Sequence, residues 1–504
     1  MNQPEASSAQ PKLSTGTAGL DLILGGGIDP GRTYLVEGTP GTGKTTLALS
    51  FLIAGARRGD TALYVTLSES EDELRAVAAN HGWSLDGIDI FELISVAGMD
   101  GEAEQSVLHP AELELGETAR AVMQRVRELN PARVVFDSLS EIRLLAENPQ
   151  RYRRQVLALK YFFAQQKCTV MLLDDRSSEP SSANADLKLH SMAHGVVTLE
   201  QIALDYGAER RRLRVVKLRG SQFRGGYHDF TIQRGGLAVY PRLVAHEHHT
   251  NFDHARVSAG NAGLDELLGG GLSPGTNTLL IGPSGVGKTT TAISALIAAL
   301  RRGSRAAYFL FDEGLPTLFA RSALLNMDLR PFVEDGQLSI RQIDPAEMSP
   351  GEFTHHVRQA IEHDQAQFIV IDSLNAYLQS MPGEKYLLLQ MHELLTYLNQ
   401  QGVITLMVLG QHGVLGQVTA AVDLSYLADC IVLMRYFEAK GEVRKAVSIM
   451  KARTANHERT IREVTIGSDG MTVSAPLKGM QGVLTGALVL TGLPGPTGPS
   501  AELA

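Results

Sequence analysis

Cysteine is almost absent from this chain, which has only Cys168 and Cys430 among its 504 residues. The two lie too far apart in sequence to suggest a metal site, and so few thiols suit a reducing compartment. No segment approaches the roughly 20 consecutive apolar residues that a membrane helix needs. Residues 1–14 are polar and do not resemble a signal peptide. We therefore expect a cytoplasmic protein with no membrane association.

Positive charge is also scarce. The chain has 46 Lys and Arg against 55 Asp and Glu, which gives a formal net charge of −9. A protein that coats nucleic acid needs a basic surface to neutralise phosphates, so this balance argues against a nucleic-acid partner. The chain is 44% hydrophobic and 20% charged, as is typical of globular proteins. Its length predicts two domains.

Internal repetition supports two domains. Four short motifs recur in the same order, each shifted by 244 positions: Gly19-Leu20-Asp21 at Gly263-Leu264-Asp265, Gly25-Gly26-Gly27 at Gly269-Gly270-Gly271, Pro30-Gly31 at Pro274-Gly275, and Arg57-Arg58-Gly59 at Arg301-Arg302-Gly303. Further along, Asp137 matches Asp372 at a shift of 235 positions. Such an ordered series indicates a duplication, in which the first copy carries a few additional residues.

The repeat sets the expected domain boundaries. We expect a disordered tail at 1–12, domains at 13–244 and 256–476, a linker at 245–255 and a C-terminal tail at 477–504. The linker contains four histidines, which could bind a metal, but their irregular spacing favours a polar connection. The proline- and glycine-rich end of the tail favours disorder.

Strand-like and helix-like segments alternate within each copy. Short apolar runs predict buried strands at 33–37, 62–67 and 133–136, and apolar periodicity predicts helices at 45–56, 117–129 and 152–166. After Thr198, strands follow one another without long helices. This order predicts an α/β fold in which each copy has a mostly parallel sheet, covered by helices on both faces and extended by antiparallel strands at one edge.

Each copy contains a phosphate-binding loop with the pattern G-x-x-x-x-G-K-S/T. The loops and the residue after each are Gly38-Thr39-Pro40-Gly41-Thr42-Gly43-Lys44-Thr45-Thr46 and Gly282-Pro283-Ser284-Gly285-Val286-Gly287-Lys288-Thr289-Thr290. Backbone N–H groups of such a loop surround the phosphates of ATP, and the lysine reaches the β- and γ-phosphates. Each loop lies between a predicted strand and a predicted helix, which is the context that the motif requires.

Acidic residues complete the expected sites. Asp137 and Asp372 each end an apolar strand, so we expect them to hold Mg²⁺ together with Thr45 and Thr289. Hydrolysis also needs a group that orients or deprotonates water. The candidates are Glu69 in the first copy and the pair formed by Asp312 and Glu313 in the second.

With these motifs in place, the chain resembles the KaiC family of circadian-clock ATPases, which are double-domain members of the RecA superfamily. The resemblance extends from about Ser14 to about Val473 and includes both loops and both Asp-Ser-Leu strand ends. It implies two tandem RecA-like domains in a homohexameric ring, with ATP between neighbouring subunits. Lys217 and Arg219, like Lys451 and Arg453, match family residues that reach the next subunit's nucleotide.

The resemblance also implies that the second domain phosphorylates itself on an adjacent Ser-Thr pair. Ser425 and Tyr426 occupy these positions, so one of the two expected phosphosites is present. The tail segment 478–491 does not resemble the family's regulatory tail. Regulatory protein partners are therefore expected, but the clock proteins themselves are not assumed.

Two other functions use the same core. A DNA-dependent motor would need a basic, aromatic-bearing loop, which the sequence does not show. A regulatory scaffold would bind nucleotide chiefly to hold its ring together. Stimulation by single-stranded DNA distinguishes the motor, and turnover rate distinguishes the scaffold, because fold alone does not decide function.

Overall fold

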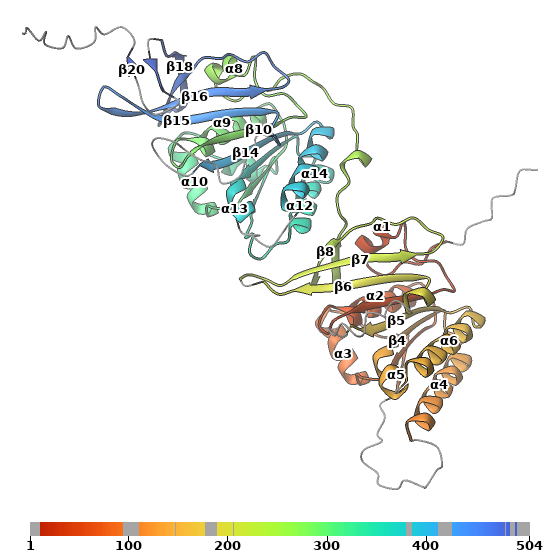
Figure 1. Cartoon of the computed structure of the whole chain (residues 1–504). Coiled ribbons are helices and arrows are strands. Elements are labelled where there is room, and N and C mark those ends of the chain that lie inside the picture. Colours follow the sequence, from red (N-terminus) through yellow and green to blue (C-terminus); the bar gives the residue numbers. More distant parts are fainter. Residues whose placement is uncertain are drawn as a thin grey trace, which may run out of the picture. The chain divides into compact units, whose positions relative to one another are not determined.

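The computed structural model describes residues 11–93, 110–146, 148–176, 189–204, 206–379, 386–411, 426–478, 480–483 and 489–490. The chain divides into two compact units, Met1–Arg242 and Leu243–Ala504 (Figure 1). Each unit is built around one large sheet.

The first unit has a nine-stranded sheet in the order β3-β2-β4-β5-β1-β6-β7-β8-β9. Its strands are β1 (Thr33–Gly38), β2 (Ala62–Thr66), β3 (Ile88–Glu92), β4 (Arg133–Asp137), β5 (Thr169–Asp175), β6 (Gly195–Ile202), β7 (Arg210–Leu218), β8 (His228–Gln233) and β9 (Gly236–Tyr240). Pairing is parallel from β3 through β6 and antiparallel from β6 to β9. The predicted parallel core with an antiparallel edge is confirmed.

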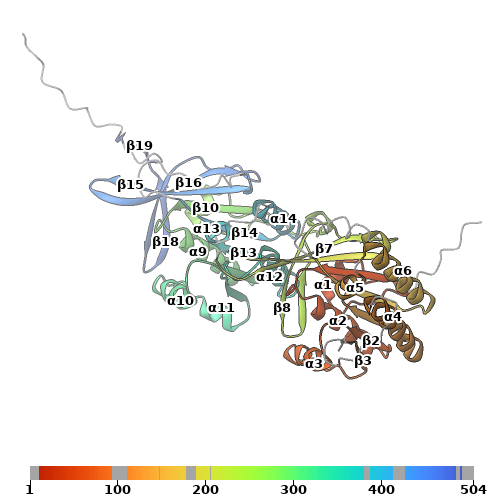
Figure 2. The same cartoon turned by 60° about the horizontal axis from the view of Figure 1, so that its bottom comes forward.

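Helices cover both faces of this sheet. They are α1 (Ala18–Ile23), α2 (Lys44–Ala56), α3 (Glu71–Asn80), α4 (Pro110–Leu129), α5 (Leu139–Ala146) and α6 (Pro149–Gln165). Successive side chains of a strand point to opposite faces. In β1, Tyr34 and Val36 enter the core beneath α1 and α2, whereas Leu35 packs beneath α4 to α6. These last three helices lie together in both views (Figures 1 and 2).

The second unit repeats this architecture in the order β12-β11-β13-β14-β10-β15-β16-β17-β18. Its strands are β10 (Asn277–Pro283), β11 (Ala306–Leu310), β12 (Leu338–Gln342), β13 (Phe368–Asp372), β14 (Ile404–Gln411), β15 (Cys430–Ala439), β16 (Glu442–Ala452), β17 (Arg462–Gly467) and β18 (Gly470–Pro476). Its helices are α8 (Ala262–Leu267), α9 (Lys288–Arg301), α10 (Leu315–Leu324), α11 (Arg330–Glu334), α12 (Pro350–Glu362), α13 (Leu374–Gln379) and α14 (Leu387–Gln400). Two apolar cores again flank the sheet.

The segment between the two repeats packs on the second unit. It contains the 3₁₀ turn η2 (Ala245–Glu247), and the His248 ring meets the Tyr397 ring edge-on at 5.1 Å. The N–H of Thr250 donates a hydrogen bond to Gln400 O at 3.2 Å. In the described part of the chain, no group of three or more His, Cys, Asp or Glu side chains is placed to share a metal ion. The histidine-rich segment thus contributes contacts to the surface of this unit.

The start of the predicted tail also packs on the second unit. Leu477, Met480 and Val483 contact a small apolar cluster that includes Phe437. A short pair of strands, β19 (Met480–Gln481) and β20 (Val489–Leu490), follows. Of the helices among the described residues, none combines the length and the apolar character needed to cross a membrane.

Candidate functional site

The two phosphate-binding loops lie at the carboxyl ends of the central strands. One joins β1 to α2 and the other joins β10 to α9. Gly43 and Gly287 cap these helices in the left-handed conformation, with φ of 95° and 114°. A Cβ on Gly43 would lie 2.8 Å from Ile232, and one on Gly287 would lie 2.5 Å from Ile466. Glycine is needed here for conformation and for space, and it leaves the helix N-terminus open to an anion.

The loop lysines have the same anchors in both units. Lys44 Nζ donates hydrogen bonds to the carbonyl oxygens of Gly38 and Thr39, both at 3.1 Å. Lys288 Nζ donates to Gly282 O and Pro283 O, both at 2.8 Å. Each ammonium is therefore held against its own loop, close to where the phosphates would lie.

The two lysines differ in their acidic neighbours. Lys44 Nζ lies 2.6 Å from Asp175 Oδ1, an ion pair at the end of β5. No carboxylate of the described residues lies within 4.0 Å of Lys288. Burial lowers the pKa of Lys288, although Asp372 acts in the opposite direction.

The strand-end aspartates are buried beside the loop threonines. Tyr64 donates a hydrogen bond to Asp137 at 2.5 Å, and Tyr308 donates to Asp372 at 2.8 Å. Burial is the main reason why the pKa of both carboxyl groups is raised. The Thr289 side chain acts against the effect of burial and lowers the pKa of Asp372. Hydroxyl and carboxylate oxygens in this arrangement fit a Mg²⁺ site, because Mg²⁺ prefers oxygen ligands.

The two tyrosines were not among the residues selected from the sequence. Tyr64 and Tyr308 lie on the strands next to β4 and β13, and their hydroxyls reach the aspartates across the sheet. They share the shift of 244 positions with the loop residues. A residue-by-residue comparison of the two copies could therefore have identified them.

Glu69 interacts electrostatically with Asp137, Lys44 and Asp175 of the first site. Burial raises its pKa, and the charge of Asp137 adds to this effect. Its buried Oε2 has no hydrogen-bond partner among the residues that the structure describes. A carboxylate with these properties is suited to accept a proton.

The matching acids of the second site, Asp312 and Glu313, both have side-chain partners. Glu313 forms an ion pair with Arg321 at 2.7 Å, and Asp312 accepts a hydrogen bond from the Ser373 hydroxyl. Val77 occupies the position that matches Arg321, so the first copy has no equivalent cation there. Arg321 was also missed from the sequence, because it lies in α10, eight residues beyond Glu313.

One cavity of about 670 Å³ gathers the residues of the second site. Lys288, Thr289, Asp312, Glu313 and Asp372 all line it, together with most of the remaining loop. The metal-binding and catalytic candidates of the second copy therefore converge on one cavity, whereas Lys451 and Arg453 are not among its lining residues. Its size is within the range of small-molecule sites.

Comparison with known proteins agrees with this geometry. The family model described as "ATPase: KaiC" matches residues 13–244 and 257–478. The chain belongs to the KaiC family of ATPases. The circadian clock protein KaiC3 of Synechocystis sp. is 26% identical over 95% of this chain and 95% of its own length. The circadian clock oscillator protein KaiC of Acaryochloris marina is 28% identical over 94% of this chain and 91% of its own length.

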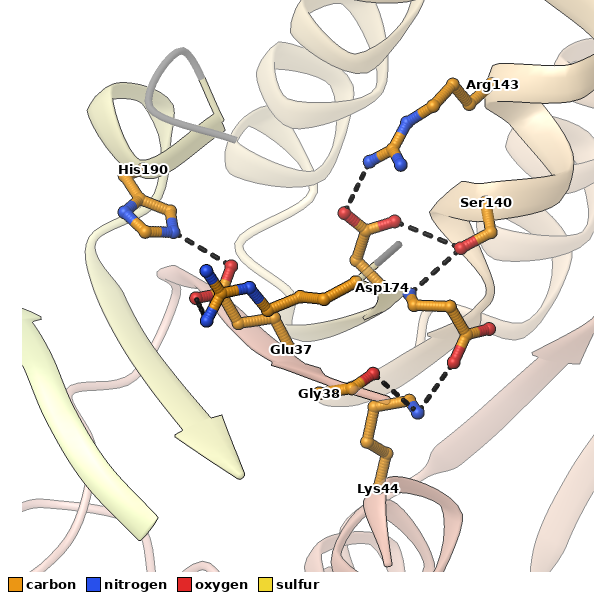
Figure 3. A network of polar contacts seen from close by, with 9 residues as sticks. Glu37, Gly38, Lys44, Ser140, Arg143, Asp174 and His190 are labelled. Atoms are coloured by element: carbon orange, nitrogen blue, oxygen red, sulfur yellow. Dashed lines mark hydrogen bonds and ion pairs between the residues drawn. The ribbon is translucent and has the colours of Figure 1, made fainter. Parts of the chain in front are cut away.

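The first KaiC-type unit has a buried polar network beside its loop (Figure 3). Glu37, which precedes Gly38, bonds to His190 and to Thr198, both at 2.8 Å. Burial alone would raise the pKa of Glu37, but these bonds and the Arg176 charge outweigh it and lower the pKa. The strand position that matches Glu37 in the second unit is Ile281.

Asp174 forms the other half of the network. Its carboxylate accepts hydrogen bonds from Arg143 at 2.6 Å and from Ser140 at 3.1 Å. Figure 3 shows both partners reaching it from the helix that follows β4. Leu409 takes the matching place in the second unit. The first site therefore has a buried polar network that the second site lacks at the matching strand positions, although the two sites share the same backbone arrangement.

The four basic residues selected as family matches contact their own unit in this structure. Lys217 donates to His190 O at 2.5 Å and to Ala193 O at 2.9 Å, and Arg219 donates to Ser191 O at 2.7 Å. In the second unit, Lys451 donates to Ala428 O at 2.7 Å, and Arg453 lies 3.3 Å from Asp429. Both pairs hold the turn that precedes β6 or β15. Ser425 lies outside the described residues, and Tyr426 beside it is exposed.

Proposed function

We propose that the chain is a Mg²⁺-dependent ATPase with two nucleotide sites and that its second site phosphorylates Ser425. The observation that supports this most strongly is the repeated set of loop lysine, loop threonine, buried strand-end aspartate and following acid. Residues 13–244 and 256–476 would be the two functional domains. Each would use the same parts for phosphoryl transfer.

Binding would begin with the loops. Their backbone N–H groups surround the phosphates, and Lys44 or Lys288 turns from its carbonyl anchors to the β- and γ-phosphates. Thr45 with Asp137, and Thr289 with Asp372, would hold Mg²⁺, which neutralises charge on the phosphates when it is bound.

Hydrolysis in the first site would use Glu69 to remove a proton from water. In the second site, Asp312 or Glu313 would remove the proton of the Ser425 hydroxyl. The serine oxygen then forms a bond to the γ-phosphorus while the bond from that phosphorus to the β–γ bridging oxygen breaks. ADP leaves, and the proton stays on the carboxylate.

A homohexameric ring would give a role to the basic residues at the ends of β7 and β16. In such a ring Lys217, Arg219, Lys451 and Arg453 would reach the nucleotide of a neighbour. A cation supplied from a neighbouring subunit can accelerate phosphoryl transfer by about 10³–10⁵-fold. The relatives are named as clock proteins, and we propose by extension a signalling role with a regulatory protein partner.

The test is incubation of the full chain with γ-³²P-ATP and Mg²⁺, comparing the native protein with Ser425→Ala. We expect labelled protein that loses its label in this variant. Tyr426→Phe is the matched control, since it removes the neighbouring hydroxyl and should keep the label. Phosphate release without labelled protein would reject the autokinase and keep the ATPase. A native mass that rises to a hexamer on addition of ATP, without measurable phosphate release, would favour a scaffold.

A further inference from the structure

The end of β5 places a carboxylate in the first phosphate site. Asp175 is paired in register with Gly38, the first residue of the loop. Its backbone N–H donates to the Ser140 hydroxyl at 2.9 Å, which holds the strand end in place. From there Asp175 Oδ1 reaches Lys44 Nζ at 2.6 Å. The lysine that should bind phosphate is already paired with an anion.

The second unit has the same backbone without the carboxylate. Gly410 is paired in register with Gly282, and its N–H donates to Asn375 at 2.6 Å. Gly410 thus matches Asp175 in strand register, and the backbone N–H of each donates a hydrogen bond to a polar side chain. It also lines the cavity that contains Lys288. The two sites therefore differ by one negative charge at this position.

The neighbours of Asp175 indicate where its charge would lie relative to a bound nucleotide. Asp175, Lys44, Asp137 and Glu69 act on one another electrostatically, so they form one cluster. The γ-phosphate has to lie between the lysine, the metal ligand and the base, whereas the loop backbone surrounds the inner phosphates. A carboxylate within this cluster repels the γ-phosphate more strongly than the β-phosphate.

We propose that Asp175 makes the first site selective for nucleoside diphosphates over nucleoside triphosphates, and that the second site lacks this selectivity. The inference rests on the proposed function, since it needs a first site that binds nucleotide. ATP has to separate Lys44 from Asp175 and leave the γ-phosphate beside an unpaired carboxylate. ADP fills the inner part of the loop and leaves that carboxylate nearer to solvent.

The experiment measures ADP and β,γ-imido-ATP affinities by calorimetry on the full chain with Mg²⁺. A Lys288→Ala background limits binding to the first site, and Lys44→Ala with Lys288→Ala is the blank. Asp175→Asn keeps the shape and removes the charge. We expect Asp175→Asn to raise the affinity for the triphosphate relative to the diphosphate by about tenfold or more. This value takes into account that the side chain is partly exposed to solvent, which weakens its charge interactions. Asp175→Glu keeps the charge and should leave the ratio near the native value.

A reciprocal variant tests the same idea in the second site. A Cβ on Gly410 would lie 3.4 Å from its nearest neighbour, the Asn375 side chain, so Gly410→Asp has space. In a Lys44→Ala background, it should shift the second site toward ADP by a similar factor. Thermal unfolding of each variant establishes that it is folded.

The outcomes are distinguishable. An unchanged affinity ratio in Asp175→Asn, with both nucleotides bound, overturns the selectivity and leaves the proposed ATPase intact. No binding of either nucleotide to the Lys288→Ala chain overturns both the first nucleotide site and this inference. A shifted ratio in Asp175→Asn that also appears in Asp175→Glu overturns the electrostatic cause.

Discussion

The two units of this chain share one sheet order and one loop geometry, yet they distribute charge in opposite ways. In the first, Lys44 is paired with Asp175, and Glu69 keeps a buried oxygen without a hydrogen-bond partner among the described residues. In the second, no described carboxylate pairs with Lys288, and Arg321 holds Glu313. The backbone of the duplicated fold is thus nearly the same in both copies, while single side chains determine which group of each site is available.

The same contrast extends into the sheet. Glu37 and Asp174 are buried at strand ends of the first unit, where the second has Ile281 and Leu409. Buried carboxylates are costly unless they are hydrogen-bonded and paired, and the partners shown in Figure 3 meet this need. The first site therefore has two additional buried carboxylates on its central strands, at positions where the second site has apolar side chains.

The largest effect on ATP hydrolysis is expected from replacing Glu69, the proposed base of the first site. Glu69→Gln in a Lys288→Ala background should lower phosphate release by about 100-fold or more, because glutamine cannot accept the proton. Glu313→Gln in a Lys44→Ala background should cost less, since Asp312 remains beside it. Steady-state phosphate release measures both. Equal losses in the two sites would show that their acids do not differ in role.

A smaller effect concerns pH. Burial raises the pKa of Glu69, and a base acts only when deprotonated, so first-site hydrolysis should fall with decreasing pH at a midpoint above the usual glutamate value of about 4.3. Val77→Arg supplies the cation that Arg321 provides in the second site. It should lower this pKa and move the acid limb of kcat/KM down by about one pH unit.

The matched control for this prediction is Arg321→Val, which should move the acid limb of the second site upward. Circular dichroism at each pH shows whether the protein stays folded. If the limb keeps its position in Val77→Arg, Glu69 is not the titrating base.

The smallest effect concerns packing and stability. A Cβ on Gly55 would lie 2.4 Å from Arg133, a buried side chain held by Asp60 at 2.9 Å. Gly55→Ala should therefore lower the free energy of unfolding of the first unit by about 1–3 kcal/mol, because the clash with Arg133 outweighs the higher helix propensity of alanine. Ala299 is the match in the second unit, where Ala299→Gly should cost about 1 kcal/mol through helix propensity alone.

Fluorescence of Trp83, the single tryptophan of the chain, reports unfolding of the first unit in this experiment. Circular dichroism reports both units. A neutral or stabilising Gly55→Ala would mean that Arg133 can move away at no cost.

Local motifs explain why much of the fold and of the two phosphate sites was predictable from the sequence. Each of these motifs is a short, unbroken stretch of sequence: a glycine loop with its lysine, or an apolar strand that ends in Asp137 or Asp372. The duplication shows each motif twice. The α/β fold followed from the alternation of strand and helix patterns, and the structure confirms it. The roles of the loop residues, the acids and the basic pairs remain predictions, because they concern ligands and neighbours.

The sequence by itself determined the duplication, the fold class and the two phosphate loops, since each depends on short-range pattern. Only the tertiary structure decided which charges meet. Asp175 pairs with Lys44 because β5 lies beside β1, and Arg321 reaches Glu313 from α10. The pairing of Asp175 with Lys44 depends on strand order and register over a long separation in sequence, and no local pattern carries that information. Glu313 and Arg321 are only eight residues apart, so their pairing depends on how the chain enters α10.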